Sequence, residues 1–241
     1  MRSLIYYYGR CADIVHTTGD ETLKKETAAL IEVLTPIVKG YVTDKSLEVC
    51  SHGVQVYGGY GYVQEFPVEQ LMRDTRIFMI YEGTNGIQAM DLVGRKLAMN
   101  GGRAIQAFFA EVDKACAEAK AKPELASLAE RIEKANGELK AATMWFMQNG
   151  LTAPNNVGAG AHHYMHIMGI VALGLQWLRM AESAQRALDA GTGNAAFYET
   201  KLVTARYFAE RYLPDCGALR RKIEAGSEAL MALSPEMFAA A

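Results

Sequence analysis

Apolar residues recur at helical spacing along almost the whole chain, and this periodicity constrains the fold more than any other feature. In residues 3–18, for example, Leu4, Tyr8, Ala12 and Val15 follow one another at intervals of three or four positions. A helix buries such a stripe against a neighbour, whereas a half-buried strand needs strict alternation. Only six prolines occur in 241 residues, so long helices can form. The sequence therefore predicts an all-α fold.

Glycines and prolines mark where the predicted helices bend and end. Pro36 predicts a kink inside the second helix, Asp44 is a candidate N-cap for the third, and Pro67 suits the first turn of a short helix. We expect the longer helices at residues 3–18, 22–41, 44–56, 87–99, 103–121, 124–148, 156–190, 195–212 and 218–233.

The stretch Asn100-Gly101-Gly102 is the best candidate for a boundary, because it combines helix-ending residues. We therefore predict one helical domain over residues 1–100 and a second over residues 101–241. Residues 157–178 carry little charge, but they contain three histidines, so we interpret them as a buried helix and expect no membrane span.

Charge and cysteine content exclude several classes of protein. Lys and Arg number 25 against 27 for Asp and Glu, so the chain lacks the basic surface that binds nucleic acid. The four cysteines are scattered without a C-x-x-C pair, which favours neither a zinc site of that kind nor a disulfide framework. The N-terminus has no apolar core of a signal peptide. We expect a cytoplasmic protein.

Three glycines fall within four positions at Gly58-Gly59-Tyr60-Gly61. Such a cluster breaks regular structure and lets other groups approach the backbone, so its N–H groups could contact a phosphate or a flavin edge. The spacing matches neither a dinucleotide-binding G-x-G-x-x-G after a strand nor a P-loop. On glycine usage alone, a turn between helices that needs positive φ is the favoured interpretation.

A second candidate is the stretch Tyr81-Glu82-Gly83-Thr84-Asn85. Glu82 follows an apolar run, where desolvation could raise its pKa toward the range of a useful general base. Gly83 would let a substrate come close. A carboxylate near a helix N-terminus, with Thr84 or Asn85 as the cap, explains the same residues equally well.

Three histidines on one predicted helix, His162, His163 and His166, form a third candidate. Spacings of three and four residues can bring two imidazoles to one metal ion. The neighbouring sequence offers no Asp or Glu ligand and no H-E-x-x-H pattern, so histidines at a helix-packing surface are the favoured interpretation. We predict no metal site.

The glycine cluster and Glu82 belong to one longer pattern over residues 54–88. These residues are V-Q-V-Y-G-G-Y-G-Y-V-Q-E-F-P-V-E-Q-L-M-R-D-T-R-I-F-M-I-Y-E-G-T-N-G-I-Q. The stretch resembles the C-terminal signature of the flavin-dependent acyl-CoA dehydrogenases, Q-x-x-G-G-x-G-[YF], then P-V-E-x-x-x-R-D, then I-Y-E-G-T-x-x-I-Q. From residue 91 onward the chain resembles the extended branch with an extra helical domain, such as the methylthiopropanoyl-CoA dehydrogenases.

This resemblance implies a fold and a reaction. It implies an acyl-CoA dehydrogenase C-terminal four-helix bundle followed by the additional helical domain, without the family's N-terminal helical domain and middle β-domain. The chain is then a fragment, or a separate piece that forms homo- or hetero-oligomers with chains supplying the rest. The implied reaction is α,β-dehydrogenation of an acyl-CoA, with FAD as acceptor and an electron-transfer flavoprotein downstream. The alternative is a non-catalytic helical assembly subunit.

The resemblance also implies roles for single residues. Glu82 matches the base that removes the α-proton, and its backbone N–H matches a donor to the thioester oxygen. Tyr81 and Gly83 would line the substrate pocket. Gly86 stands where many family members have Gln or Glu, so one cofactor contact is absent unless Asn85 replaces it. The implied cofactor-binding residues are Gln55, Gly58, Gly59, Thr84 and Gly86.

Overall fold

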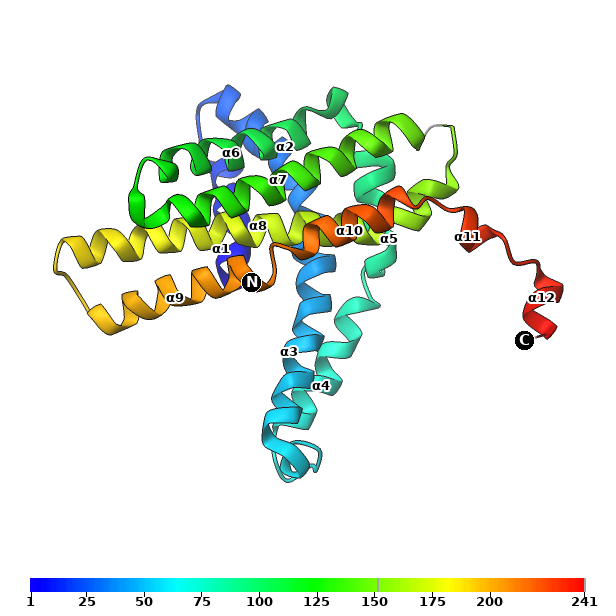
Figure 1. Ribbon diagram of the computed structural model, residues 1–241, viewed down its shortest axis with the longest axis horizontal. Coiled ribbons are helices and arrows are strands. Elements are labelled where there is room, and N and C mark those ends of the chain that lie inside the picture. Colours follow the sequence, from blue (N-terminus) through cyan, green and yellow to red (C-terminus); the bar gives the residue numbers. More distant parts are fainter. Residues whose placement is uncertain (151, 241) are drawn as a thin grey trace.

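The computed structural model describes residues 1–150 and 152–240, so Leu151 and Ala241 of the predicted segment 101–241 lie outside the described residues. Within the described part every regular element is helical, which confirms the predicted all-α fold. Figure 1 shows two helices, α3 (Val42–Tyr57) and the shorter α4 (Val68–Arg76), projecting from the body as an arm, while α6 (Arg103–Lys120) to α10 (Asp215–Glu224) lie roughly side by side. No described helix is both long and apolar enough to cross a membrane.

Short π- and 3₁₀-helical segments lie among the α-helices of residues 37–102, and the described residues after them form α-helices joined by turns. The π and 3₁₀ segments are η1 (Ile37–Tyr41), η2 (Gly58–Gly61), η3 (Ile77–Met79), η4 (Leu92–Lys96) and η5 (Met99–Gly102). The α-helices are α1 (Arg2–Thr17), α2 (Glu21–Pro36), α3 (Val42–Tyr57), α4 (Val68–Arg76), α5 (Asn85–Asp91), α6 (Arg103–Lys120), α7 (Pro123–Asn149), α8 (Asn155–Asp189), α9 (Ala195–Arg211), α10 (Asp215–Glu224), α11 (Glu228–Met231) and α12 (Pro235–Ala240).

Helix α8 forms the centre of the molecule. It is 35 residues long, and its middle is buried almost without interruption, which confirms the buried helix predicted over residues 157–178. It packs against α7, α9 and α10, and also against α5 and η1. The buried apolar residues from Leu4 to Ile223 form one cluster. Helices on both sides of Asn100 share this core, so the two-domain division remains a prediction.

Pro36 ends α2 and explains a buried lysine. Proline has no N–H to donate to the carbonyl oxygen of Glu32, four residues earlier. The ammonium of Lys96 donates to that oxygen at 2.8 Å. Lys96 is only 5% exposed, and the carboxylates of Glu32 and Asp91 face its charge at 3.3 and 3.5 Å. The chain continues as the π-helix η1, so regular α-helix stops at Pro36, and a kink there stays a prediction.

The structure confirms one predicted helix end and differs from the prediction at two other places. Asn100, Gly101 and Gly102 all have positive φ, of 53°, 69° and 78°, which confirms the helix end predicted there. Asp44 is not an N-cap, because α3 continues directly from η1 and buries the Asp44 side chain. The predicted helix over 218–233 is wrong as one element, since Gly226, with φ of 68°, separates α10 from α11.

A close approach between α8 and η1 depends on Gly169. A Cβ at this position would lie 2.3 Å from Cγ of the buried Tyr41 ring. We expect Gly169→Ala to lower the free energy of unfolding by about 1–3 kcal/mol, because the overpacked helices must shift. Urea denaturation measures this change.

The matched control is Gly137→Ala on α7, where an added Cβ meets nothing within 4 Å. Its unfolding free energy should stay the same or rise by up to about 1 kcal/mol, because alanine favours the helix. Equal stability of the Gly169 and Gly137 variants would show that α8 and η1 are not in tight contact.

Candidate functional site

The residues predicted to bind a cofactor fall into two groups, one at the far end of the arm and one where the chain returns to the body. Gln55 lies in the last turn of α3, and Gly58 and Gly59 begin η2. Thr84 and Gly86 belong to the start of α5, next to Glu82 in sequence. Figure 1 shows the turn after α3 at the far end of the arm and α5 beside the body. The structure therefore separates the two groups along the arm.

Each glycine at the tip of the arm has its own backbone environment. Gly58 has φ of 60° and ψ of −141°, a region that side-chain-bearing residues rarely adopt. A Cβ on Gly61 would lie 2.5 Å from the carbonyl oxygen of Val54. The turn itself therefore requires glycine at these two positions. Gly59, in contrast, is exposed, and a Cβ there meets nothing within 4 Å, so its backbone is open to a ligand from the solvent side.

Glu82 occupies a strained backbone position. Its φ is 52°, and Gly83 follows with φ of 83°. A left-handed conformation costs a non-glycine residue about 1–2 kcal/mol, and such residues concentrate at functional sites. The side-chain amide of Gln88 donates to the carbonyl oxygen of Glu82 at 3.4 Å. Thr84 caps α5 by accepting from the N–H of Ile87 at 3.4 Å, as the capping interpretation predicted.

The side chains of Glu82 and Tyr81 are exposed, so the described residues alone do not supply the desolvation that we expected around Glu82. Many large apolar side chains between residues 56 and 87 are exposed instead. Where such side chains gather, another domain or chain commonly covers them. The exposed apolar residues are Val56, Tyr57, Tyr60, Tyr62, Phe66, Leu71, Ile77, Phe78, Ile80, Tyr81 and Ile87.

Asn85 is the buried centre of a polar network where the arm meets the body. Its amide nitrogen lies 2.7 Å from Oδ1 of Asp44, 2.9 Å from Oγ1 of Thr43 and 3.0 Å from the carbonyl oxygen of Gly40, and its two N–H groups are shared among these three acceptors. Its amide oxygen accepts from Nζ of Lys39 at 2.8 Å. Because these bonds engage both ends of the amide, Asn85 anchors the start of α5. A cofactor contact by Asn85 in place of Gly86 stays a prediction.

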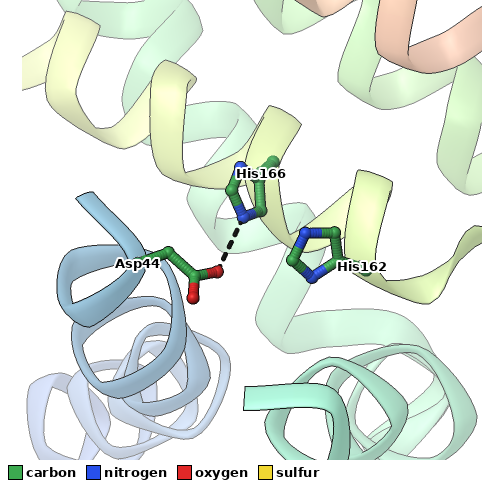
Figure 2. A group of neighbouring side chains, drawn as sticks. All are labelled: Asp44, His162 and His166. Carbon is green, nitrogen blue, oxygen red and sulfur yellow. Dashed lines mark hydrogen bonds and ion pairs between the residues drawn. The ribbon is translucent and has the colours of Figure 1, made fainter. Parts of the chain in front are cut away.

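Two of the predicted packing histidines on α8 meet Asp44 of α3. Figure 2 shows His166 directed toward the Asp44 carboxylate, with His162 beside it. Nε2 of His166 lies 2.9 Å from Oδ2 of Asp44, and the ring centroids of His162 and His166 are 4.3 Å apart. Sequence reasoning missed this acidic neighbour because 122 residues separate Asp44 from His166.

The charges in this cluster follow from its partial burial. Burial alone would raise the pKa of Asp44, but hydrogen bonds from His166 and Asn85 outweigh it and hold that pKa below its usual range. Desolvation, and then the nearby His166, lower the pKa of His162, although its ring is partly exposed. His162 is therefore neutral near pH 7, while Asp44 is ionised.

Two protein-family models match most of the chain. The model described as "Acyl-CoA dehydrogenase, C-terminal domain" matches residues 15–98, and the model described as "Acetyl-CoA dehydrogenase C-terminal like" matches residues 108–234.

Similar proteins are found among curated sequences and among solved structures. The 3-methylmercaptopropionyl-CoA dehydrogenase of Ruegeria pomeroyi is 36% identical over 90% of this chain and 37% of its own length. The broad-specificity linear acyl-CoA dehydrogenase FadE5 of Mycobacterium tuberculosis is 32% identical over 94% of this chain and 38% of its own length. The crystal structure of Caenorhabditis elegans ACDH-11 in complex with C11-CoA superposes with a TM-score of 0.73 at 19% identity, covering 95% of this chain and 37% of that one, and supports the fold.

The chain thus spans little more than a third of the length of the curated relatives it matches. The two matched models follow one another along it and leave only short stretches unmatched. Together with the helical fold, these matches place the chain in a family: it belongs to the acyl-CoA dehydrogenases, as a stretch similar to their C-terminal part.

Proposed function

We propose that this chain is the C-terminal portion of an acyl-CoA dehydrogenase that introduces a trans α,β double bond into an acyl-CoA thioester, with Glu82 as the base. The observation that carries the proposal is the left-handed backbone of Glu82, with φ of 52°, in a chain of this family. A non-glycine residue keeps such a conformation only where the surrounding structure holds it, and these positions cluster at active sites.

Glu82 has two tasks in this reaction. The α-proton of a thioester is only weakly acidic, so its removal needs a positioned base and stabilisation of the charge that develops on the thioester oxygen. The Glu82 carboxylate takes the α-proton, and the Glu82 N–H donates to the thioester oxygen. Gly83 has no side chain and lets the acyl chain come close, while Tyr81 lines the pocket.

Removal of the α-proton is efficient only in a dry site, and the exposed apolar surface of the arm supports the view that other domains or subunits cover Glu82. The same surface suits assembly into a homo- or hetero-oligomer. FAD, when bound, supplies the acceptor for the β-hydride, and an electron-transfer flavoprotein is the partner that reoxidises it.

The residues at the tip of the arm fit a role in holding FAD. The exposed backbone at Gly58 and Gly59 has open space in front of it, and Gln55 is exposed one turn earlier. At the other end of the arm, Thr84 accepts a hydrogen bond as a helix cap and keeps its hydroxyl proton for a second partner. Gly86 beside it is exposed and adds no side chain that would obstruct a cofactor.

A second candidate function is a non-catalytic helical subunit, which the exposure of Glu82 favours. The visible absorption spectrum of the native protein that contains this chain separates the two functions. A bound flavin that acyl-CoA bleaches supports the dehydrogenase, whereas a colourless protein that leaves acyl-CoA unchanged supports the assembly subunit.

Replacement of Glu82 tests the base. In the native protein, Glu82→Gln should slow flavin bleaching by acyl-CoA about 10²- to 10⁴-fold, because the amide cannot take the α-proton. Binding of the CoA ester should change little. Stopped-flow absorbance under anaerobic conditions measures the rate. The matched control is Glu199→Gln, an exposed glutamate on α9, which should bleach at the wild-type rate. Wild-type bleaching by the Glu82 variant would remove Glu82 from this role.

Replacement of Gly59 tests the cofactor contact at the tip of the arm. Gly59→Leu should leave the fold intact, because a side chain there meets nothing within 4 Å, but it should obstruct FAD. We expect a lower ratio of flavin to protein absorbance after gel filtration. Gly137→Leu on α7 also points into open space and should retain full flavin. Equal flavin content in both variants would count against cofactor binding at the tip.

A further inference from the structure

We propose that Asp44, His162 and His166 bind one divalent transition-metal ion where the arm joins the body. The three residues offer one carboxylate oxygen and two imidazole nitrogens, and these ligand atoms all lie within 4.8 Å of one another. Two imidazoles and a carboxylate are a ligand set that Zn²⁺ accepts, with a fourth position open to water. This site is separate from the dehydrogenation chemistry proposed for Glu82.

The geometry is close to that of a metal site. Ligand atoms around a tetrahedral Zn²⁺ lie about 3.3 Å apart, given metal–ligand distances of about 2.0–2.2 Å. Oδ2 of Asp44 and Nε2 of His166 are already 2.9 Å apart. His162 lies one helical turn before His166 on the same face of α8. Figure 2 shows its ring beside that of His166, and its ligand nitrogen lies within 4.8 Å of the other two ligand atoms.

A second set of residues holds the carboxylate in place. Asn85 donates to Oδ1 of Asp44 at 2.7 Å, which leaves Oδ2 directed toward the histidines. Lys39 in turn donates to the amide oxygen of Asn85 at 2.8 Å. Hydrogen bonds of this kind, from outside the ligand set, orient metal ligands and are worth about 10- to 100-fold in metal affinity. The hydrogen bonds from Lys39 to Asn85 and from Asn85 to Asp44 are therefore of the kind that orients a metal ligand.

The local charge also suits a cation. Asp44 is buried, and its carboxylate faces the two histidines, so a metal ion there would receive a carboxylate ligand shielded from water. Imidazole binds a divalent metal ion through a nitrogen lone pair, which both histidines can offer. The ammonium of Lys45, in the first turn of α3, pairs with Glu48 at 2.8 Å, which reduces its repulsion of a metal ion.

A metal ion at this point would join α3 to α8. Asp44 lies in the first turn of α3, and the two histidines lie on the central helix. Asn85 connects the same carboxylate to the start of α5, three residues after Glu82. The ion would therefore fix the base of the arm against the body and stabilise the folded protein.

Zinc binding by the native protein tests the proposal. After removal of metals with a chelator, isothermal titration with Zn²⁺ alone should give one site per chain. His162→Gln and Asp44→Asn should each weaken the affinity at least about tenfold, as loss of a ligand exceeds loss of its support. Zn²⁺ should raise the melting temperature of the wild type but not that of His162→Gln.

The matched control is His163→Gln, next to His162 on α8 but outside the ligand set. Its zinc affinity should equal that of the wild type. The His162 variant keeps the test decisive if Asp44→Asn fails to fold, because His162 is exposed at the surface. Absence of zinc binding, wild-type affinity in His162→Gln or in a folded Asp44→Asn variant, or an equal loss in His163→Gln would each overturn the proposal.

Discussion

The burial of helix α8 on nearly all sides is the constraint on which the rest of the structure depends. Most residues from Gly160 to Leu178 are buried, so neighbouring helices must cover most of the surface of this stretch. Helices α7, α9 and α10 cover part of it, and α5 and η1 cover another part. A glycine on α8, Gly169, admits the Tyr41 ring of η1. The stretches that match two family models thereby share one core.

This core also sets the place of the candidate site. Helix α8 presents His166 to Asp44, and Asp44 accepts a hydrogen bond from Asn85 at the start of α5. The strained turn at Glu82 lies immediately before α5, so the polar network fixes one end of the turn that we propose as catalytic. The arm beyond it is held by few buried residues and offers an apolar surface to other parts of the protein.

Local patterns predicted most of the helices and their ends, because periodicity and helix-ending residues act within a few positions of one another. The buried helix over residues 157–178 and the boundary at Asn100 to Gly102 are examples. The proximity of Asp44 to His166 could not be predicted in this way, since it arises from packing between elements 122 residues apart. The break at Gly226 was missed because a lone glycine within a periodic run is compatible with either outcome.

The environment and backbone conformation of Glu82 could not be predicted from the sequence either. The resemblance identified the residue, but the exposure of its side chain depends on which surfaces meet the arm. Its backbone conformation, with φ of 52°, was not visible in the pattern either, because a strained glutamate has no residue-type signature of the kind that glycine provides.

Exchange of the substrate α-proton tests the central claim most directly. The native protein is incubated anaerobically with a saturated acyl-CoA in D₂O and without an electron acceptor, so that the reaction can run backwards. The base then returns a deuteron to the α-carbon, and mass spectrometry of the recovered thioester detects it. We predict deuterium at the α-carbon. Recovery of the acyl-CoA without α-deuterium would contradict proton removal by this protein.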